Sequence, residues 1–403
     1  MEKLLQEDEA RNPGLTSWAA AAMILSYAFG IGVFSLPHAC AVLGWFHFGV
    51  LLLVNLGGWT LSATLYMTIY SMYPQGKTLP DAARYAFGST GQSSATFLQV
   101  GFNVLFAASF HLTMAISLSD CVGGALGKLE SWILVGLVQL ALLQARNLES
   151  LTFLSVLGAA GVILPCLGML VYFFVEGFSK SLETEAVASS PWQRTLTAYM
   201  NVIFSYSGQH IWIDVQAQCK GPRTFRMAAI QATLCITAFY VLISFAAYFC
   251  LGKDTLQQSF PVTHYVNNQS MQLVLSIFVI IHCAIGYYVC AHVFVRCCEQ
   301  ITLPGLQQIP ECKRFSLTVI FVGVAFILSF VVPFFTDLLS LSTSIFLVVL
   351  TYTFPLLLYL QMAKLTRLQS WKYMCLTIAS IGLLIAGFVS SIMTTLEDLQ
   401  NEQ

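Results

Sequence analysis

The sequence contains few charged side chains. Of its 403 residues, 18 are Lys or Arg and 19 are Asp or Glu, a charged fraction of 9%, whereas soluble proteins carry about 25%. Because 57% of the chain is hydrophobic, these charges are too few to cover the surface of a soluble globule of this length. The formal net charge is −1, and the longest basic run is Lys313-Arg314. The composition therefore excludes a soluble domain and gives no indication of a nucleic-acid partner.

Sequence features of several other protein classes are also missing. The first thirteen residues mix acidic and basic side chains, unlike the basic start of a cleavable signal peptide. Most of the twelve cysteines fall within apolar runs, where we expect small core residues and not a disulfide framework. The chain has neither a G-x-S-x-G nor an H-E-x-x-H motif, and residues 123–128 are one residue short of a phosphate-binding loop. These absences predict a non-enzyme without a cofactor or metal.

Long apolar stretches make up most of the chain. A helix needs about 20 mostly apolar residues to cross about 30 Å of hydrocarbon, and eleven stretches fit this description. They are residues 16–43, 47–73, 92–120, 131–146, 151–176, 196–217, 226–251, 271–295, 315–335, 337–362 and 372–394. We therefore expect an all-α polytopic membrane protein with eleven transmembrane helices. Residues 16–395 form the transmembrane domain in this interpretation, between a cytoplasmic tail (1–15) and an extracytoplasmic tail (396–403).

The positions of Lys and Arg predict the orientation in the lipid bilayer. With the N-terminus in the cytoplasm, all basic residues but four fall in inner segments, as the positive-inside rule requires. The four exceptions are Lys128, Lys180, Arg194 and Lys253. A glycosylation sequon at Asn268 falls in an expected outer loop, which agrees with this orientation. The sequence does not distinguish the plasma membrane from a vacuolar or lysosomal membrane.

Glycine-containing interruptions occur in the first and sixth apolar stretches. The first contains Gly30-Ile31-Gly32, and the sixth contains Ser205-Tyr206-Ser207-Gly208. Secondary transporters built from inverted repeats have helices that are broken at corresponding places in the two halves. The alternative is that these glycines allow close helix packing. Because the two interruptions occupy matching positions of a five-plus-five repeat, we favour broken helices.

Five motifs stand in a fixed order along the chain. They are FGIGVFSLPHACAVLGW (29–45), YAFG (85–88) after Asp81, QLALLQARNLESLTFLSVLGAAG (139–161), FSYSGQHIWIDVQAQCKGPRTF (204–225) and PFFTDLL (333–339). Together they resemble the amino acid/auxin permease family over about residues 16–362, and the fourth motif is similar to its lysine/histidine-transporter-like branch. Phe34 and His38 are unusual within the first motif, and Thr336 replaces a glycine in the last.

The resemblance implies a LeuT-like fold of two inverted five-helix repeats plus one extra helix. It also implies ion-driven transport of amino acids, of which neutral ones are favoured here. At helix breaks, free N–H groups attract a carboxylate and free carbonyl groups attract an ammonium group or a cation. We therefore expect the main-chain groups of the substrate between the two breaks. The expected contacts are Gly30, Ile31, Gly32, Val33, Tyr206, Ser207, Gly208 and Gln209.

Ser26 bears on the choice of coupling ion. Relatives that are coupled to sodium are similar in having an Asn shortly before the glycines of the first span. Ser26 occupies that position here. The resemblance to proton-coupled plant members favours protons. A serine hydroxyl still binds sodium, so Ser26 remains a candidate ion ligand and sodium coupling remains the alternative.

Asp214 is the main candidate for a proton carrier, because ionisable side chains at membrane depth are costly and are often functional. His210 lies four residues earlier, on the same face if the helix has resumed, and is a candidate relay. The alternative for Asp214 is an inner-interface acid paired with Lys220 or Arg223. The alternative for His210 is a packed, hydrogen-bonded histidine.

Other ionisable residues in or near the apolar stretches are expected to be structural. His111 and His282 lie in the middle of the third and eighth stretches, where packed histidines are expected. Asp120, Glu176 and Asp337 lie near the outer ends, where water lowers the cost of a charge. We expect these acids in loops or in a vestibule.

Two other membrane-protein classes compete with a transporter. A nutrient-sensing receptor with the same fold would bind an amino acid without moving it, and the sequence does not separate this function from transport. A passive channel is disfavoured, because paired helix breaks indicate an occluding site near the middle of the bilayer.

Overall fold

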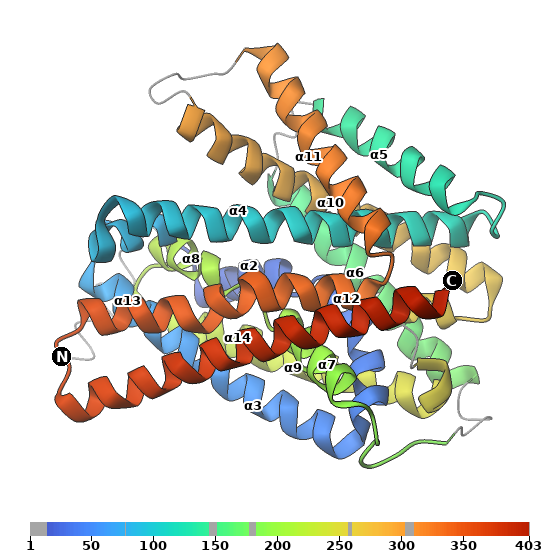
Figure 1. The fold of residues 1–403 in the computed structure, drawn as a ribbon, viewed down its shortest axis with the longest axis horizontal. Helices are drawn as coiled ribbons and strands as arrows, with labels where there is room; N and C mark the ends of the chain where they lie inside the picture. Colours follow the sequence, from blue (N-terminus) through green and yellow to red (C-terminus); the bar gives the residue numbers. More distant parts are fainter. Residues whose placement is uncertain are drawn as a thin grey trace.

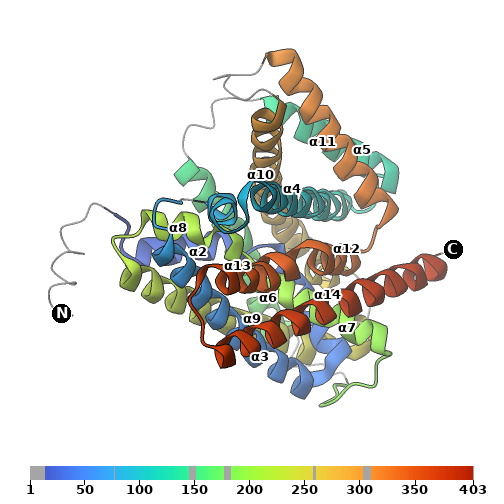
Figure 2. The same ribbon diagram turned by 60° about the vertical axis from the view of Figure 1, so that its left-hand side comes forward.

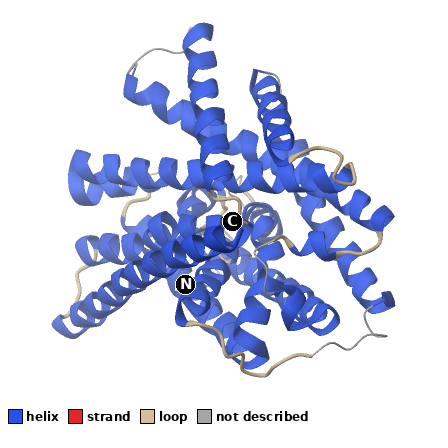
Figure 3. Cartoon of the chain, turned by 45° about the vertical axis from the view of Figure 1, so that its right-hand side comes forward, coloured by secondary structure: helices blue, strands red, loops and turns tan. Residues whose placement is uncertain are grey.

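The computed structural model describes residues 14–76, 78–144, 151–176, 183–256, 260–302 and 310–402. Within these ranges every regular element is a helix (Figure 3), apart from one isolated β-bridge between Leu15 and Cys219. The prediction of an all-α chain is therefore confirmed.

The helices follow the apolar stretches closely. In chain order they are α2 (Ser17–Ala28), η1 (Ile31–Ser35), α3 (Leu36–Met72), α4 (Leu79–Cys121), α5 (Lys128–Gln144), α6 (Leu151–Glu176), α7 (Trp192–Ser205), η3 (Gln209–Ile211), α8 (Trp212–Gln218), α9 (Pro222–Leu256), η4 (Val262–Tyr265), α10 (Gln269–Thr302), α11 (Glu311–Val331), α12 (Phe335–Ser342), η5 (Thr343–Leu347), η6 (Val349–Thr353), α13 (Phe354–Met362) and α14 (Arg367–Glu402). Here η1, η3 and η4 are 3₁₀-helices, and η5 and η6 are π-helical.

Eight helical stretches of the described residues are long and apolar enough to cross a bilayer. Three of the expected spans are not counted separately. The helix α5 has 17 residues, residues 16–43 are divided between α2, η1 and the start of α3, and residues 196–217 are divided between α7, η3 and α8. The number eleven therefore stays a prediction. Large apolar side chains on the outside of the bundle, such as Phe97, Val175 and Ile378, are more than 60% exposed, as lipid contact requires.

The long helices pack around the broken ones at different angles, and α11 is steeply inclined to α4 (Figure 1). In Figure 1, α4 crosses the whole molecule, with α12, α13 and α14 below it. Both α4 and α6 pack on α10, while α3 packs on α9 and α7. The pair α5 and α11 lies side by side at one edge in both Figure 1 and Figure 2. The residues of both helix breaks are buried inside the bundle.

Two helix boundaries differ from the expected ones, and a third agrees with them. The first and second spans meet between their expected ends at Gly44, whose non-helical φ of 78° and ψ of 166° suit glycine and divide α3 into two helices joined by a kink. A Cβ atom there would lie 2.7–2.9 Å from the main chain of Ala186 and Ala188, so the bend also lets this segment pack closely. The third helix begins earlier, at Leu79, because Thr78 and Asp81 form a capping box. The last helix extends to Glu402, beyond the expected end of the domain.

Candidate functional site

The first helix break lies where the sequence predicts it. The helix α2 ends at Ala28, Gly30 is extended (φ −120°, ψ −159°), and η1 begins at Ile31. The first hydrogen bond inside η1 joins the N–H of Val33 to the carbonyl of Gly30 at 3.3 Å. The N–H groups of Ile31 and Gly32 therefore have no partner within the helix. All these residues are buried, so the polar main chain at the break is shielded from the surroundings of the bundle.

The second break also lies at the predicted position. The helix α7 ends at Ser205, and Gly208 adopts the left-handed conformation with φ 115° before η3 and α8 follow. A residue with a Cβ atom rarely adopts this conformation, which gives Gly208 a conformational reason to be glycine. Ser207 donates its N–H to the carbonyl of Phe204 at 2.9 Å, and it is buried. The break is thus a defined turn.

Gln209 spans the second break with its side chain. Its Nε2 donates to the carbonyl of Tyr206, and its Oε1 accepts from the Thr351 hydroxyl at 3.2 Å. Thr351 belongs to the π-helical segment η6, whose main chain also accepts hydrogen bonds from Ser62 and Tyr66 of α3. The Gln209 amide therefore ties the break to a third irregular helix, and both of its polar atoms already have partners.

A single tyrosine joins the two breaks. The Tyr240 hydroxyl of α9 donates to the carbonyl of Ser205 at the end of α7, and it lies 3.5 Å from the carbonyl of Ala28 at the end of α2. Carbonyl groups at helix ends attract cations and donors. Here they face a phenol hydroxyl, a partner that the sequence analysis did not identify.

Aromatic side chains enclose the second break. The ring of Tyr206 lies 5.3 Å from that of Tyr240 and 6.2 Å from that of Trp59, and Trp59 lies 5.3 Å from Trp212. The Tyr206 hydroxyl is held by Thr237 at 3.0 Å. These large rings exclude water, so polar interactions at the break are stronger than in solution.

Gly30 and Gly32 differ in what a side chain would meet. A Cβ atom on Gly32 would lie 2.9 Å from the Ser205 hydroxyl and 3.0 Å from the ring of Phe204. Gly32 therefore lets η1 pack against the end of α7. A Cβ atom on Gly30 would have its nearest contacts at 3.9 Å, from Phe106 and from Nε2 of His282. Of the two glycines, Gly30 is the one with room for a methyl group beside it, in ordinary van der Waals contact with both neighbours.

His282 faces this space with an unused acceptor. Its Nδ1 is 2.8 Å from the carbonyl of Gly158, a contact that requires the proton on Nδ1. The neutral ring then has a lone pair on Nε2, which is buried and has no partner among the described residues. The ring packs edge-on against Phe110, with centroids 5.9 Å apart. From the sequence alone, His282 is expected only to pack.

Asp214 lies in the first turn of α8, just beyond the second break, and is half-buried. Among the described residues it forms no ion pair with Lys220 or Arg223, which was the alternative for this acid. The backbones of His210 and Ser26 belong to η3 and α2. The side chains of both lie outside the described part of the structure, so their suggested roles stay predictions.

The expectation for Asp337 is wrong. It lies in the first turn of α12 and is 0% exposed, whereas the sequence analysis expected a loop or vestibule residue. Neither carboxyl oxygen has a hydrogen-bond partner among the described residues. The reason is that α14 continues to Glu402 and covers this end of α12.

Paired helix breaks inside an apolar helical bundle are typical of secondary transporters. Comparison with known proteins gives the family. The chain matches the family described as transmembrane amino acid transporter protein over residues 13–397, and it therefore belongs to that family. It is an integral membrane protein.

Curated relatives match along nearly their full length. Amino acid permease 3 of Arabidopsis thaliana is 28% identical over 98% of this chain and 94% of its own. Lysine histidine transporter-like 3 of the same plant is 21% identical over 91% of this chain and 87% of its own. The resemblance to amino acid permeases that the five motifs indicate is thereby confirmed.

Solved structures show the same fold. Mhp1 in an inward-facing conformation superposes with a TM-score of 0.61 at 12% identity, covering 96% of this chain and 92% of its own. MhsT in complex with L-phenylalanine superposes with a TM-score of 0.55 at 12% identity, covering 94% of this chain and 100% of its own. The LeuT-like fold is therefore confirmed.

Proposed function

We propose that this protein is a secondary active transporter that moves neutral amino acids together with protons by alternating access. The main support for the proposal is the pair of buried helix breaks. Near the first one lies the Nε2 atom of the neutral His282 ring, which has no partner in the described part of the chain. The N–H groups of Ile31 and Gly32 suit the substrate carboxylate, and the Nε2 lone pair of His282 suits its ammonium group. Amino acid permease 3 and MhsT with L-phenylalanine support this substrate class by analogy.

Our preference for neutral substrates is based on the neighbours of Gly30. Its neighbours are Phe106 and the uncharged ring of His282, and Phe110 packs on that ring. An Asp or Glu side chain of a substrate would bury a charge there without a cationic partner, which is unfavourable. Apolar and small polar substrates avoid this cost.

Asp214 is the proposed proton carrier at this site. Its carboxyl group is half-buried beside the second break, on the helix that resumes after Gly208. When the surroundings are dry, burial favours the protonated form, and when water reaches the acid it releases the proton. Alternation between these conditions couples proton movement to transport.

Uptake into proteoliposomes of purified protein tests the proposal. A labelled neutral amino acid is offered with a pH gradient, with a sodium gradient, or with neither. Accumulation that follows the pH gradient supports the proposed symport, and accumulation that follows only sodium supports the alternative coupling. Binding without accumulation under either gradient supports a nutrient-sensing receptor. We place the N-terminus in the cytoplasm, with either the plasma membrane or a vacuolar or lysosomal membrane as the location.

A further inference from the structure

A second buried acid, Asp337, lies on α12, whereas Asp214 lies on α8. Asp337 is fully buried in the first turn of α12, and both of its carboxyl oxygens lack partners among the described residues. Charges in protein interiors are normally paired and hydrogen-bonded. A buried carboxyl group without either is expected to carry a proton.

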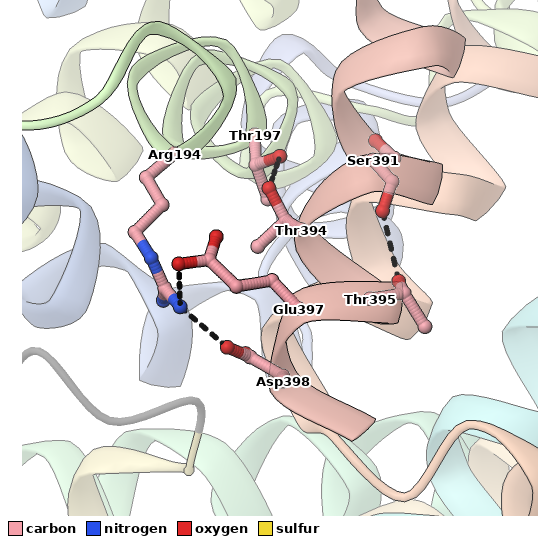
Figure 4. Close-up of polar contacts among 7 residues, drawn as sticks. All are labelled: Arg194, Thr197, Ser391, Thr394, Thr395, Glu397 and Asp398. Carbon is pink, nitrogen blue, oxygen red and sulfur yellow. Dashed lines mark hydrogen bonds and ion pairs between the residues drawn. The ribbon is translucent and has the colours of Figure 1, made fainter. Parts of the chain in front are cut away.

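The nearest cation is already paired with other acids. Arg194, in the first turn of α7, donates to Asp398 at 2.6 Å and lies 3.6 Å from Glu397. Figure 4 shows its guanidinium group directed at these two side chains near the end of α14. In the described residues, the charged groups that act on Asp337 from the elements packed against α12 are Arg194 from α7 and Glu397 and Asp398 from α14. Two acids thus hold Arg194 and add negative charge near Asp337.

The neighbouring hydroxyl group also suits a protonated acid. Thr395 is close to Asp337, but its hydroxyl donates to the carbonyl of Ser391 at 2.9 Å (Figure 4). Its oxygen is therefore left to accept, and a carboxyl O–H group supplies the donor. A bound metal ion fits less well, since no cluster of three or more His, Cys, Asp or Glu in the described residues is arranged to hold one.

We propose that Asp337 is a proton-binding site, and that Arg194 pairs with Asp398 while Asp337 is protonated and with Asp337 after it ionises. In the ionising step the carboxyl O–H bond breaks, the proton passes to water at the α14 end of the bundle, and the carboxylate takes Arg194 as its partner. The protonation state of Asp337 thus controls whether α7 is held to α14 or to α12. This inference rests on the proposed proton-coupled transport and adds a site on the opposite side of the second break from Asp214.

Asp337→Asn is the first test, because the amide imitates a protonated carboxyl group in size and polarity. In proteoliposomes we expect exchange of labelled for unlabelled amino acid within about twofold of the wild type, and loss of the accumulation driven by a pH gradient. If the wild type responds to the pH gradient and Asp337→Asn accumulates equally well, the inference is overturned and the proposed symport stands. If the wild type ignores the pH gradient, the proposed symport fails and the inference fails with it.

Asp398→Asn is a second test that leaves the proposed proton site in place. It frees Arg194 to attract the Asp337 carboxylate, so ionised Asp337 becomes more favourable. The midpoint of the pH dependence of uptake should move to lower pH by about one unit, within the usual range for a nearby opposite charge. The matched control is Glu397→Gln, whose contact with Arg194 is longer at 3.6 Å, and which should shift the midpoint less. An unchanged or raised midpoint in Asp398→Asn contradicts the inference.

Infrared spectroscopy tests the protonation directly and does not depend on transport. The carbonyl-stretch band of a protonated carboxyl group should be present in the purified wild type and reduced by one group in Asp337→Asn. Identical bands in the two proteins would show that Asp337 is ionised, and this result would overturn the inference.

Discussion

The hydroxyl group of Tyr240 on α9 donates a hydrogen bond to the carbonyl group of Ser205, the last residue of α7. The same hydroxyl lies 3.5 Å from the carbonyl of Ala28, the last residue of α2. One side chain therefore contacts the ends of both broken helices. Because the Ser205 carbonyl cannot pair within α7, the hydroxyl stabilises the second break. Its contact with Ala28 is weaker, since the carbonyl of Ala28 already accepts from the N–H of Gly30 at 3.0 Å.

Tyr240→Phe should destabilise the breaks while keeping the aromatic packing. The buried carbonyl of Ser205 loses its donor, which costs about 1–3 kcal/mol. We expect a lower thermal unfolding temperature in detergent and an uptake rate reduced by about tenfold or more, corresponding to about 1.4 kcal/mol in the barrier. Tyr288→Phe on α10 is the control, since the described Tyr288 ring stacks on His292 without a hydroxyl contact. Equal behaviour of the two variants would show that the Tyr240 hydroxyl is unimportant.

Alanine substitutions at Gly30 and Gly32 should give different defects. Gly32→Ala places a Cβ atom 2.9–3.0 Å from Ser205 and Phe204, so η1 and α7 must separate and the protein loses stability as well as transport. Gly30→Ala meets its neighbours at 3.9 Å and should remain as stable as the wild type. Its added methyl group occupies space beside His282, so substrate affinity should fall. Thermal unfolding and equilibrium binding of labelled amino acid, measured on the same preparations, separate the two effects. Normal binding by Gly30→Ala would remove this space from the site.

His282→Asn tests the acceptor for the substrate ammonium group. The Asn amide retains a donor toward the carbonyl of Gly158 but does not reach the position of Nε2. We expect KM for a neutral amino acid to rise by about tenfold, the effect of losing about 1.4 kcal/mol of binding, with little change in stability. The control is His282→Gln, which extends its acceptor further and should recover part of the affinity. An unchanged KM in His282→Asn would identify His282 as a packing residue.

Asp214→Asn imitates the protonated acid permanently. We expect it to bind and exchange amino acids but to lose accumulation driven by a pH gradient, because the variant has no proton to release at this position. Counterflow and gradient-driven uptake, measured in the same proteoliposomes, distinguish the two activities. Accumulation in proportion to the imposed pH gradient would show that Asp214 has a structural role.

His264 and Asp120 should make stability depend on pH in a small and defined way. Nδ1 of His264 lies 3.2 Å from the Asp120 carboxylate, and this contact raises the pKa of His264 above its ordinary value of 6.5. A raised pKa in the folded protein means that the pair stabilises it fully below pH 6.5 and loses this contribution as the pH rises through the folded-state pKa. Because the His264 side chain is 39% exposed, solvent screening limits the effect to about 0.5 kcal/mol.

Thermal unfolding of the wild type and of His264→Gln, measured from about pH 5.5 to 8.5, checks this prediction. The range extends from roughly one unit below to two units above the ordinary pKa of histidine. The wild type should be more stable at the acidic end and equal to the variant at the basic end. A difference that grows with pH has the opposite sign and contradicts the assigned pairing.

The sequence is sufficient to predict the helical fold and the places of the breaks. Gly30 and Gly208 interrupt apolar stretches at matching positions, and the positive φ of Gly208 explains the second interruption. The kink at Gly44 falls between the first two expected stretches, whereas the close approach of Ala186 and Ala188 to it follows only from the fold. The start of α4 is missed, because its first turns are polar and depend on a capping box at Thr78.

The side chains of the site are harder to predict because their roles depend on distant partners. Tyr240 stands in an ordinary apolar stretch, and only the fold brings its hydroxyl to Ser205. His282 is visible in the sequence, but its free acceptor follows from the contact with Gly158, 124 residues away. Asp337 is misjudged because residues 396–403 are expected as a tail, whereas α14 continues over it as a helix.

Gradient-driven uptake by the reconstituted wild-type protein is the most direct test of proton-coupled amino acid transport. Proteoliposomes receive a labelled neutral amino acid while the pH gradient and the sodium gradient are imposed separately. We predict accumulation above the outside concentration when the pH gradient alone is present, and its collapse when a proton ionophore dissipates that gradient. Accumulation that requires sodium and is indifferent to pH, or binding without accumulation under either gradient, would contradict this account.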